Sequence, residues 1–179
     1  HPFDIKAWCA ACKSVTDMRI TWHYCGSNPT GSVHPAWTET CACSQCGLNS
    51  RMRALIDLLV SKLNVSQTAH VYIAEQTTVS FKVVQNLFEN VIGSEYLGPG
   101  YKLGEVVADF NGHVNVRHDD LSRLSFADSV FDIVLSQDVF EHIPEYLNTF
   151  SESARILKRG GSLVFTIPFF YDQAETRIS

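Results

Sequence analysis

Four cysteines near the start of the chain have a spacing typical of metal ligands. They form two pairs, Cys9-x-x-Cys12 and Cys43-x-x-Cys46. Two residues between thiolates let both sulfurs reach one ion from a tight turn, and two such turns complete a tetrahedral four-sulfur site. The spacing therefore predicts zinc bound by Cys9, Cys12, Cys43 and Cys46.

The other two cysteines leave alternatives open. All six cysteines lie before Gly47, and the rest of the chain has none. Six cysteines in a small secreted domain would instead suggest disulfides, but their confinement to one segment favours a metal. Cys25 and Cys41 are then spare thiols, with Cys41 a possible substitute for Cys43, and His23 and His34 are possible substitute ligands.

A second set of polar residues follows apolar segments that read as strands. Acidic residues come after or within three of these segments, and a serine and a glutamine close a fourth: Glu75, Glu95, Asp119, Asp120, Ser136 and Gln137. Because open parallel sheets hold ligands at the carboxyl ends of their strands, we expect Glu95 and Asp120, at successive strand ends, to lie beside one ligand.

Strands and helices alternate along the chain after the cysteines, which predicts a parallel sheet with helices on its faces. The apolar segments predict strands at 70–74, 91–97, 113–117, 131–136 and 162–167. Helical spacing predicts helices at 51–63, 79–90 and 144–157, the last with Tyr146, Leu147 and Phe150 facing the core and Gly160-Gly161 ending it. The Gly- and Pro-marked segment 98–112 shows no clear helix.

The segment 114–170 resembles the central part of class I S-adenosylmethionine-dependent methyltransferases of the type 11-like group, through Asp120-Leu121-Ser122-Arg123-Leu124-Ser125-Phe126 and FDIVLSQDVFEHI. The resemblance implies an α/β fold, a Rossmann-like parallel sheet of order 3-2-1-4-5, and S-adenosylmethionine as cofactor. The confinement of all six cysteines and all three tryptophans to the segment before Gly47 predicts a small N-terminal zinc-ribbon-like module. We call residues 1–47 the cysteine module and expect residues 48–179 to form the methyltransferase core.

The resemblance also implies roles for individual residues. Glu95, beside Tyr96, would bind both ribose hydroxyls, because a carboxylate has several acceptor sites. Asp120, flanked by Asp119 and Leu121, would meet the adenine amino group. The backbone carbonyls near Ser136 and Gln137 would meet the methionine ammonium. Glu141 and His142 would lie close to the transferable methyl group, where either could take a proton.

The first predicted loop departs from the family pattern. Glu75 matches the acidic residue after the first strand, but Gln76-Thr77-Thr78 stand where the family has glycines, and no glycine occurs between Leu48 and Ile92. Either the hydroxyls of Thr77 and Thr78 bind the methionine carboxylate at a helix N-terminus, or the pocket is partly closed. The absence of G-x-G-x-x-G after the first strand argues against a nicotinamide enzyme.

Three functions remain open. We expect methyl transfer to a small molecule or sugar. The alternatives are a non-catalytic protein that joins a zinc ribbon to a degenerate Rossmann-like domain, and an RNA methyltransferase. The net charge of −5 and the scattered Lys6, Lys13 and Arg19 make nucleic acid the less favoured partner.

The apolar runs and the two ends of the sequence give expectations for where the protein is located and how it assembles. No apolar run is long enough to span a bilayer, and the start has no signal-peptide pattern, so we expect a cytoplasmic protein. The family usually continues past the fifth strand, whereas this chain stops at Ser179. We therefore expect a fragment that lacks the last two strands, whose fifth strand either pairs in a homodimer or is covered by residues 170–179.

Overall fold

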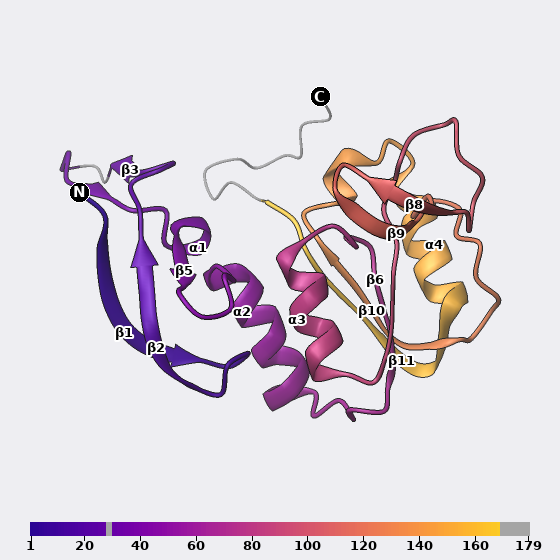
Figure 1. The fold of residues 1–179 in the computed structure, drawn as a ribbon, viewed down its shortest axis with the longest axis horizontal. Coiled ribbons are helices and arrows are strands. Elements are labelled where there is room, and N and C mark those ends of the chain that lie inside the picture. The colour runs from indigo at the N-terminus through magenta and orange to yellow at the C-terminus, as the bar shows by residue number, and fades with distance from the viewer. Residues whose placement is uncertain (28–29, 169–179) are drawn as a thin grey trace.

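The computed structural model describes residues 1–27 and 30–168 (Figure 1). Its centre is a four-stranded parallel sheet of order β11-β10-β6-β7. These strands are β6 (His70–Ile73), β7 (Asn90–Gly93), β10 (Phe131–Gln137) and β11 (Leu157–Thr166). In chain order the strands are arranged 2-1-4-5, which confirms the Rossmann-like sheet and four of its five expected positions.

Helices cover both faces of this sheet, because its strands alternate their apolar side chains between two cores. Val71 and Ile73 pack with two helices on one face, and Tyr72 packs with a third helix on the other. The two helices on the first face are α2 (Ser50–Asp57) and α3 (Val79–Leu87). In Figure 1 they lie between the parallel sheet and the N-terminal strands. The helical segments are α2 (Ser50–Asp57) with its π-helical continuation (Leu58–Lys62), α3 (Val79–Leu87), a 3₁₀ turn (Phe140–His142) and α4 (Tyr146–Ile156).

The third predicted strand is present but occupies a different sheet. β9 (His113–Arg117) pairs antiparallel with β8 (Val106–Phe110), which lies in the segment where we expected no regular element. Asn111 and Gly112 join the two strands with φ of 51° and 82°. The third strand meets the second only just beyond its end, through a parallel bridge between Glu95 and His118.

The last helix and strand differ from the prediction in two respects. α4 ends at Ile156, and Gly160-Gly161 lie inside β11, beside a register irregularity where Phe131 pairs with Leu157 and Ile133 with Ser162. β11 is an edge strand of the described sheet. The predicted cover, residues 170–179, lies outside the described residues, and pairing with a second copy stays a prediction.

The cysteine module forms its own antiparallel sheet. β1 (Phe3–Cys9), β2 (Ser14–Ile20) and β5 (Cys41–Cys43) pair in that order. Alternate residues face a small core made of Cys9, Met18, Ile20, Cys41 and Cys43. The remaining elements are short: β3 (Gly26–Ser27), β4 (Val33–His34) and α1 (Trp37–Thr40). No helix in the described part of the chain is long and apolar enough to cross a membrane.

Gly93 allows α3 to pack closely against β7. A Cβ atom added there would lie 2.5 Å from Cε2 of Phe81 and 3.0 Å from Cβ of Gln76. We expect Gly93→Ala to lower the free energy of unfolding by about 1–3 kcal/mol, because overpacking moves the buried Phe81 ring. Urea denaturation measures this effect. Gly100→Ala is the matched control, because a Cβ there meets no atom within 4 Å, and equal losses for both variants would contradict the packing explanation.

Candidate functional site

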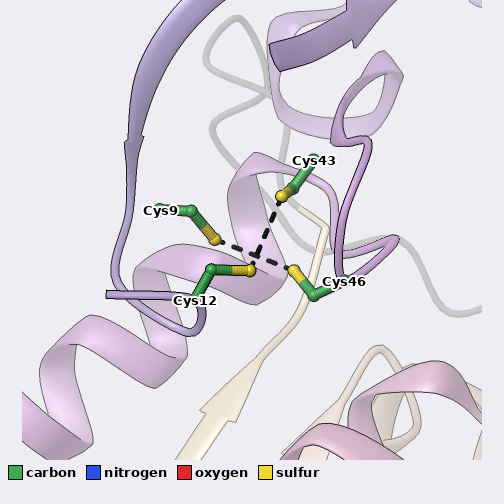
Figure 2. Close-up of side chains that lie close together, drawn as sticks. All are labelled: Cys9, Cys12, Cys43 and Cys46. Atoms are coloured by element: carbon green, nitrogen blue, oxygen red, sulfur yellow. Dashed lines mark hydrogen bonds between the residues drawn. The ribbon is translucent and has the colours of Figure 1, made fainter. Parts of the chain in front are cut away.

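The structure brings the four predicted cysteines together. Their Sγ atoms all lie within 4.8 Å of one another, and two pairs, Cys9–Cys46 and Cys12–Cys43, are separated by 3.7 and 3.8 Å (Figure 2). Each separation joins a sulfur from the first turn to one from the second. A tetrahedral site with Zn–S bonds of about 2.3 Å has sulfur–sulfur edges of about 3.8 Å. Two of the six sulfur–sulfur separations match this value, so the cluster has the arrangement of a four-sulfur zinc site.

The surroundings of Cys43 favour the thiolate that metal binding requires. Burial raises the pKa of Cys43, but hydrogen bonds from Thr16 and from the backbone of Cys46 and Gln45 outweigh burial and lower the pKa to about 6. The Thr16 hydroxyl lies 3.1 Å from Sγ of Cys43. The pKa values of Cys12 and Cys46 are instead raised, because burial is not outweighed by hydrogen bonds there.

The spare cysteines lie outside this cluster. All six cysteines are free thiols in the structure, so the disulfide alternative finds no support there. Cys41 is buried, and its Sγ accepts a hydrogen bond of 3.7 Å from Arg53. Cys25 is exposed. Cys43, not its possible substitute Cys41, therefore completes the four-sulfur group.

A second polar cluster lies at the carboxyl ends of β6 and β10. Glu75, Ser136 and Gln137 are at most 6% exposed. The backbone N–H of Gln137 donates to Oε1 of Glu75 over 3.0 Å. Within the described residues, Oε2 of Glu75, Oγ of Ser136 and Oε1 of Gln137 have no hydrogen-bond partner. Buried polar atoms are nearly always paired, so three unpaired atoms gathered at neighbouring strand ends are available to a polar ligand.

Glu75 is a protonatable group in this cluster. Burial raises its pKa to about 8; the N–H of Gln137 and the charge of Arg51 oppose the rise, while Glu95 and Asp138 add to it. An unfolded glutamate ionises near its ordinary value of 4.5. Between these two pH values the unfolded chain holds fewer protons than the folded chain, so Glu75 makes stability fall as pH rises.

We expect Glu75→Gln to remove this pH dependence. Relative to the wild type, the free energy of unfolding of the variant should rise between pH 5 and pH 8, with a slope of at most about 1.4 kcal/mol per pH unit. Urea denaturation of both proteins across this range measures the difference. A difference that stays constant with pH would show that Glu75 is ionised in the folded chain.

The loop after β6 contacts Glu95 through Thr77. The backbone N–H and the hydroxyl of Thr77 both donate to Oε2 of Glu95, over 3.2 and 2.7 Å. Thr78 caps α3: its hydroxyl accepts from the N–H of Phe81 and donates to the carbonyl of Glu75. Thr77 thus contacts Glu95, the residue predicted to bind the ribose. The Thr78 hydroxyl already has two hydrogen-bond partners.

Asp119 and Asp120, the two acidic residues after the third strand, have different surroundings. Asp119 is 2% exposed, and its carboxylate accepts from Arg117 and from the N–H of Ser125. Leu121 is buried in the core on the α4 face of the sheet. Asp120 is only half-buried, and its Oδ1 accepts from the N–H and the hydroxyl of Ser122. Asp120 is therefore the more accessible of the two carboxylates.

Asp120 and Tyr96 line a cavity of about 520 Å³. The Tyr96 ring is 59% exposed and lies 5.5 Å from the buried ring of His118, centroid to centroid. Tyr101 contacts His118 at 5.8 Å, so the imidazole lies near two tyrosine rings. Aromatic walls and a carboxylate form a suitable surface for a planar, hydrogen-bonding ring.

The predicted proton acceptors lie on the 3₁₀ turn after β10. His142 has a largely exposed side chain, and its Nε2 lies 4.0 Å from Oε1 of Glu141. The described residues do not show either side chain in contact with the buried polar cluster.

Two residues at this edge have roles that the sequence did not suggest. Arg51 forms ion pairs with Glu39 and Asp138. Gln76 replaces a family glycine and ties the first loop to the third strand, because its amide bonds the carbonyl of Asn115 and the N–H of Arg117. Partners so distant in sequence leave no local signal.

Comparisons with known proteins match this chain to methyltransferases. A family model described as a methyltransferase domain matches residues 76–165, half of the chain. A demethylmenaquinone methyltransferase from Alkalihalophilus pseudofirmus is 34% identical over 64 residues, which cover 32% of this chain and 27% of that protein. A sarcosine/dimethylglycine N-methyltransferase from Halorhodospira halochloris is 43% identical over 47 residues, or 26% and 17% of the two chains. The chain thus spans about a quarter or less of these curated relatives.

Solved structures share the fold. A protein from Pyrococcus horikoshii superposes with a TM-score of 0.50 and 24% identity, over 69% of this chain and 55% of that one. A Galdieria sulphuraria protein assigned to the sarcosine dimethylglycine methyltransferases has the same TM-score of 0.50 and 19% identity, over 66% and 45%. The fold and the matched motifs together show that this chain belongs to the methyltransferase domain family.

Proposed function

We propose that the chain binds S-adenosylmethionine at the carboxyl ends of β6, β7 and β10 and transfers its methyl group to a small molecule. The observation that carries this proposal is the cluster of unpaired buried atoms on Glu75, Ser136 and Gln137. Leaving each such atom unpaired costs about 1–3 kcal/mol, which a polar ligand would recover. A cofactor with an ammonium group matches a cluster made of oxygen acceptors.

The chain's own residues would hold the two ends of the cofactor. Glu95 would accept both ribose hydroxyls; Thr77 contacts only one of its oxygens, Oε2, which leaves the other for a ligand. Asp120 and Tyr96 would hold the adenine in the adjoining cavity. The carbonyls near Ser136 and Gln137 would orient the ammonium.

When bound, S-adenosylmethionine would supply a methyl group on a sulfonium, and a nucleophile that takes this methyl displaces neutral S-adenosylhomocysteine. Most of the rate would come from holding donor and acceptor in contact. His142 or Glu141 would take the proton that an oxygen or nitrogen acceptor releases, because both lie on the turn after β10.

We also propose that the cysteine module, residues 1–47, is a zinc module and that residues 48–179 form the methyltransferase core. The module buries only a small core, and a metal bound by Cys9, Cys12, Cys43 and Cys46 would supply much of its stability. The support is the four-sulfur geometry, together with the module's own antiparallel sheet and its buried cluster of Cys9, Met18, Ile20, Cys41 and Cys43.

The acceptor is proposed only by class. The relatives named above act on demethylmenaquinone and on sarcosine or dimethylglycine, which are small molecules, and the acidic charge of the chain agrees with a small acceptor. An RNA acceptor would be the alternative if methyl transfer occurred only with RNA.

Calorimetric titration of the zinc-loaded chain with S-adenosylhomocysteine tests the proposal. We expect saturable binding at one site per chain, and methyl transfer from labelled S-adenosylmethionine when small amines, quinols and sugars are supplied. A folded chain that gives no binding heat at millimolar ligand would contradict the proposal and favour the non-catalytic binding protein.

A further inference from the structure

Arg51, in the first turn of α2, connects the cysteine module to the carboxyl edge of the parallel sheet. Its Nε and Nη2 pair with the two carboxylate oxygens of Glu39 at 2.9 and 3.1 Å. Nη2 also lies 2.9 Å from Oδ2 of Asp138, and the Arg51 side chain is only 20% exposed. One guanidinium thus joins a carboxylate from each part of the chain, in the planar geometry that arginine favours.

Asp138 is the next residue after Gln137 and has a constrained backbone. Its φ is 54°, which is uncommon for a residue with a side chain. Its N–H donates to the carbonyl of Thr166, and its Oδ1 accepts from the Thr166 hydroxyl at 2.9 Å. Such a conformation persists only when its surroundings hold it. Arg51 therefore helps to fix the residue that follows β10, the strand that ends in Ser136 and Gln137.

The other end of the connection reaches the zinc ligands. Glu39 belongs to α1, which leads directly into β5 and Cys43. Arg53, two residues after Arg51 on the same helix, donates to the carbonyls of Cys41 and Leu48 at 2.9 and 2.8 Å. These two carbonyls flank the turn that carries Cys43 and Cys46. The start of α2 is therefore bound on one side to the metal turn and on the other to the cofactor edge.

We propose that Arg51 is a positioning residue that couples zinc binding in the cysteine module to cofactor binding at the carboxyl edge. This inference rests on the proposed function. Zinc orders the turn next to Glu39; the bidentate pair then holds the Arg51 guanidinium, which holds Asp138 and the strand end beside it. Thermodynamic linkage makes the coupling reciprocal, so cofactor binding strengthens zinc binding by the same factor.

The test measures the dissociation constant of S-adenosylhomocysteine with and without zinc, for the wild type and three variants. Arg51→Gln and Glu39→Gln break the connection from either side and leave every cysteine in place. Arg19→Gln is the matched control, because Arg19 forms an exposed pair with Asp4 on the outer face of the same module. Circular dichroism melting confirms that each variant is folded.

We expect zinc removal to weaken binding by the wild type and by Arg19→Gln about tenfold. Arg51→Gln and Glu39→Gln should bind about tenfold more weakly even with zinc, and zinc removal should then change their affinity less than about twofold. Reciprocally, S-adenosylhomocysteine should slow zinc loss to a chelator in the wild type and not in Arg51→Gln.

Two results would overturn the inference, and they are distinguishable. If zinc removal weakens binding equally in the wild type and in Arg51→Gln, or in none of the proteins, the coupling through Arg51 is wrong while the proposed function stands. If the zinc-loaded wild type binds no S-adenosylhomocysteine, the proposed function fails and the coupling fails with it.

Discussion

Cys43→Ser is expected to abolish stoichiometric zinc binding and to unfold the cysteine module. Cys43 is buried, contacts Cys12 across the cluster and accepts a hydrogen bond from Thr16. A serine there leaves three thiolates, and the free energy of metal binding is also folding free energy in a module with so small a core. We expect the module to lose several kcal/mol of stability, on the order of the larger effects of single substitutions. Metal analysis and thermal melting measure the two losses.

Two other cysteines provide the controls for this variant. Cys25→Ser should keep one zinc per chain, because Cys25 is exposed and lies outside the four-sulfur group. Cys41→Ser should also keep the metal and lose only its packing and its contact with Arg53. Full zinc content in Cys43→Ser, or loss of zinc in Cys41→Ser, would show that the ligand set is wrong.

Glu95→Ala is expected to weaken binding of S-adenosylhomocysteine about 100-fold, because each hydrogen bond to a charged group contributes about 1.5–3 kcal/mol and two ribose hydroxyls would lose theirs. Glu95 meets Thr77 in the first loop, so the substitution also frees a polar loop residue. Calorimetric titration measures the affinity, and circular dichroism checks the fold.

Glu89→Ala is the matched control for this substitution. Glu89 is exposed and precedes the amino end of β7, whereas Glu95 follows its carboxyl end. The control should bind S-adenosylhomocysteine as the wild type does. Equal affinity of Glu95→Ala and Glu89→Ala would place the ribose somewhere other than at Glu95.

The sequence predicted best what depends on local spacing. The four cysteines form one cluster because each pair occupies a single turn, and two turns need only face each other. The parallel strands were found because buried strands are short apolar runs between polar loops. The side chains at their carboxyl ends, such as Glu75 and Gln137, meet because parallel strands end at one edge.

The antiparallel hairpin was missed although the sequence carried its signal. Asn111-Gly112 stands between two segments of β-forming residues, and Asn-Gly is the strongest short-range indication of a two-residue hairpin turn. Both residues have positive φ, as such a turn requires. The segment 98–112 was interpreted from its glycines and proline alone, so β8 was overlooked.

The buried face of α4 was predicted wrongly. Tyr146, Leu147 and Phe150 are 45%, 67% and 39% exposed, whereas Thr149 and Ser153 are fully buried. Residues four apart share one face of a helix, and in α4 the face that carries Thr149 and Ser153 is the one turned inward. Phe150 instead packs against Phe140 and Phe165 at centroid distances of 5.0 and 5.6 Å, a contact that depends on the tertiary fold.

The role of Arg51 could not be predicted from the sequence for a related reason. Its two carboxylate partners, Glu39 and Asp138, come from segments far before and far after it. An arginine near a helix start has no preference for one of these carboxylates over water until the fold places both within reach. The ion pairs of Arg51 with Glu39 and Asp138 therefore become evident only from the structure.

A crystal structure of the zinc-loaded chain with S-adenosylhomocysteine tests the proposed site most directly. We predict a nucleoside with its ribose hydroxyls against Glu95 and its adenine beside Asp120, and the amino acid end against the strand ends that carry Ser136 and Gln137. Two results would contradict the proposal that this edge is the methyl-donor site. One is a ligand bound elsewhere, and the other is a structure at saturating ligand in which Glu95 contacts only Thr77 and no ligand.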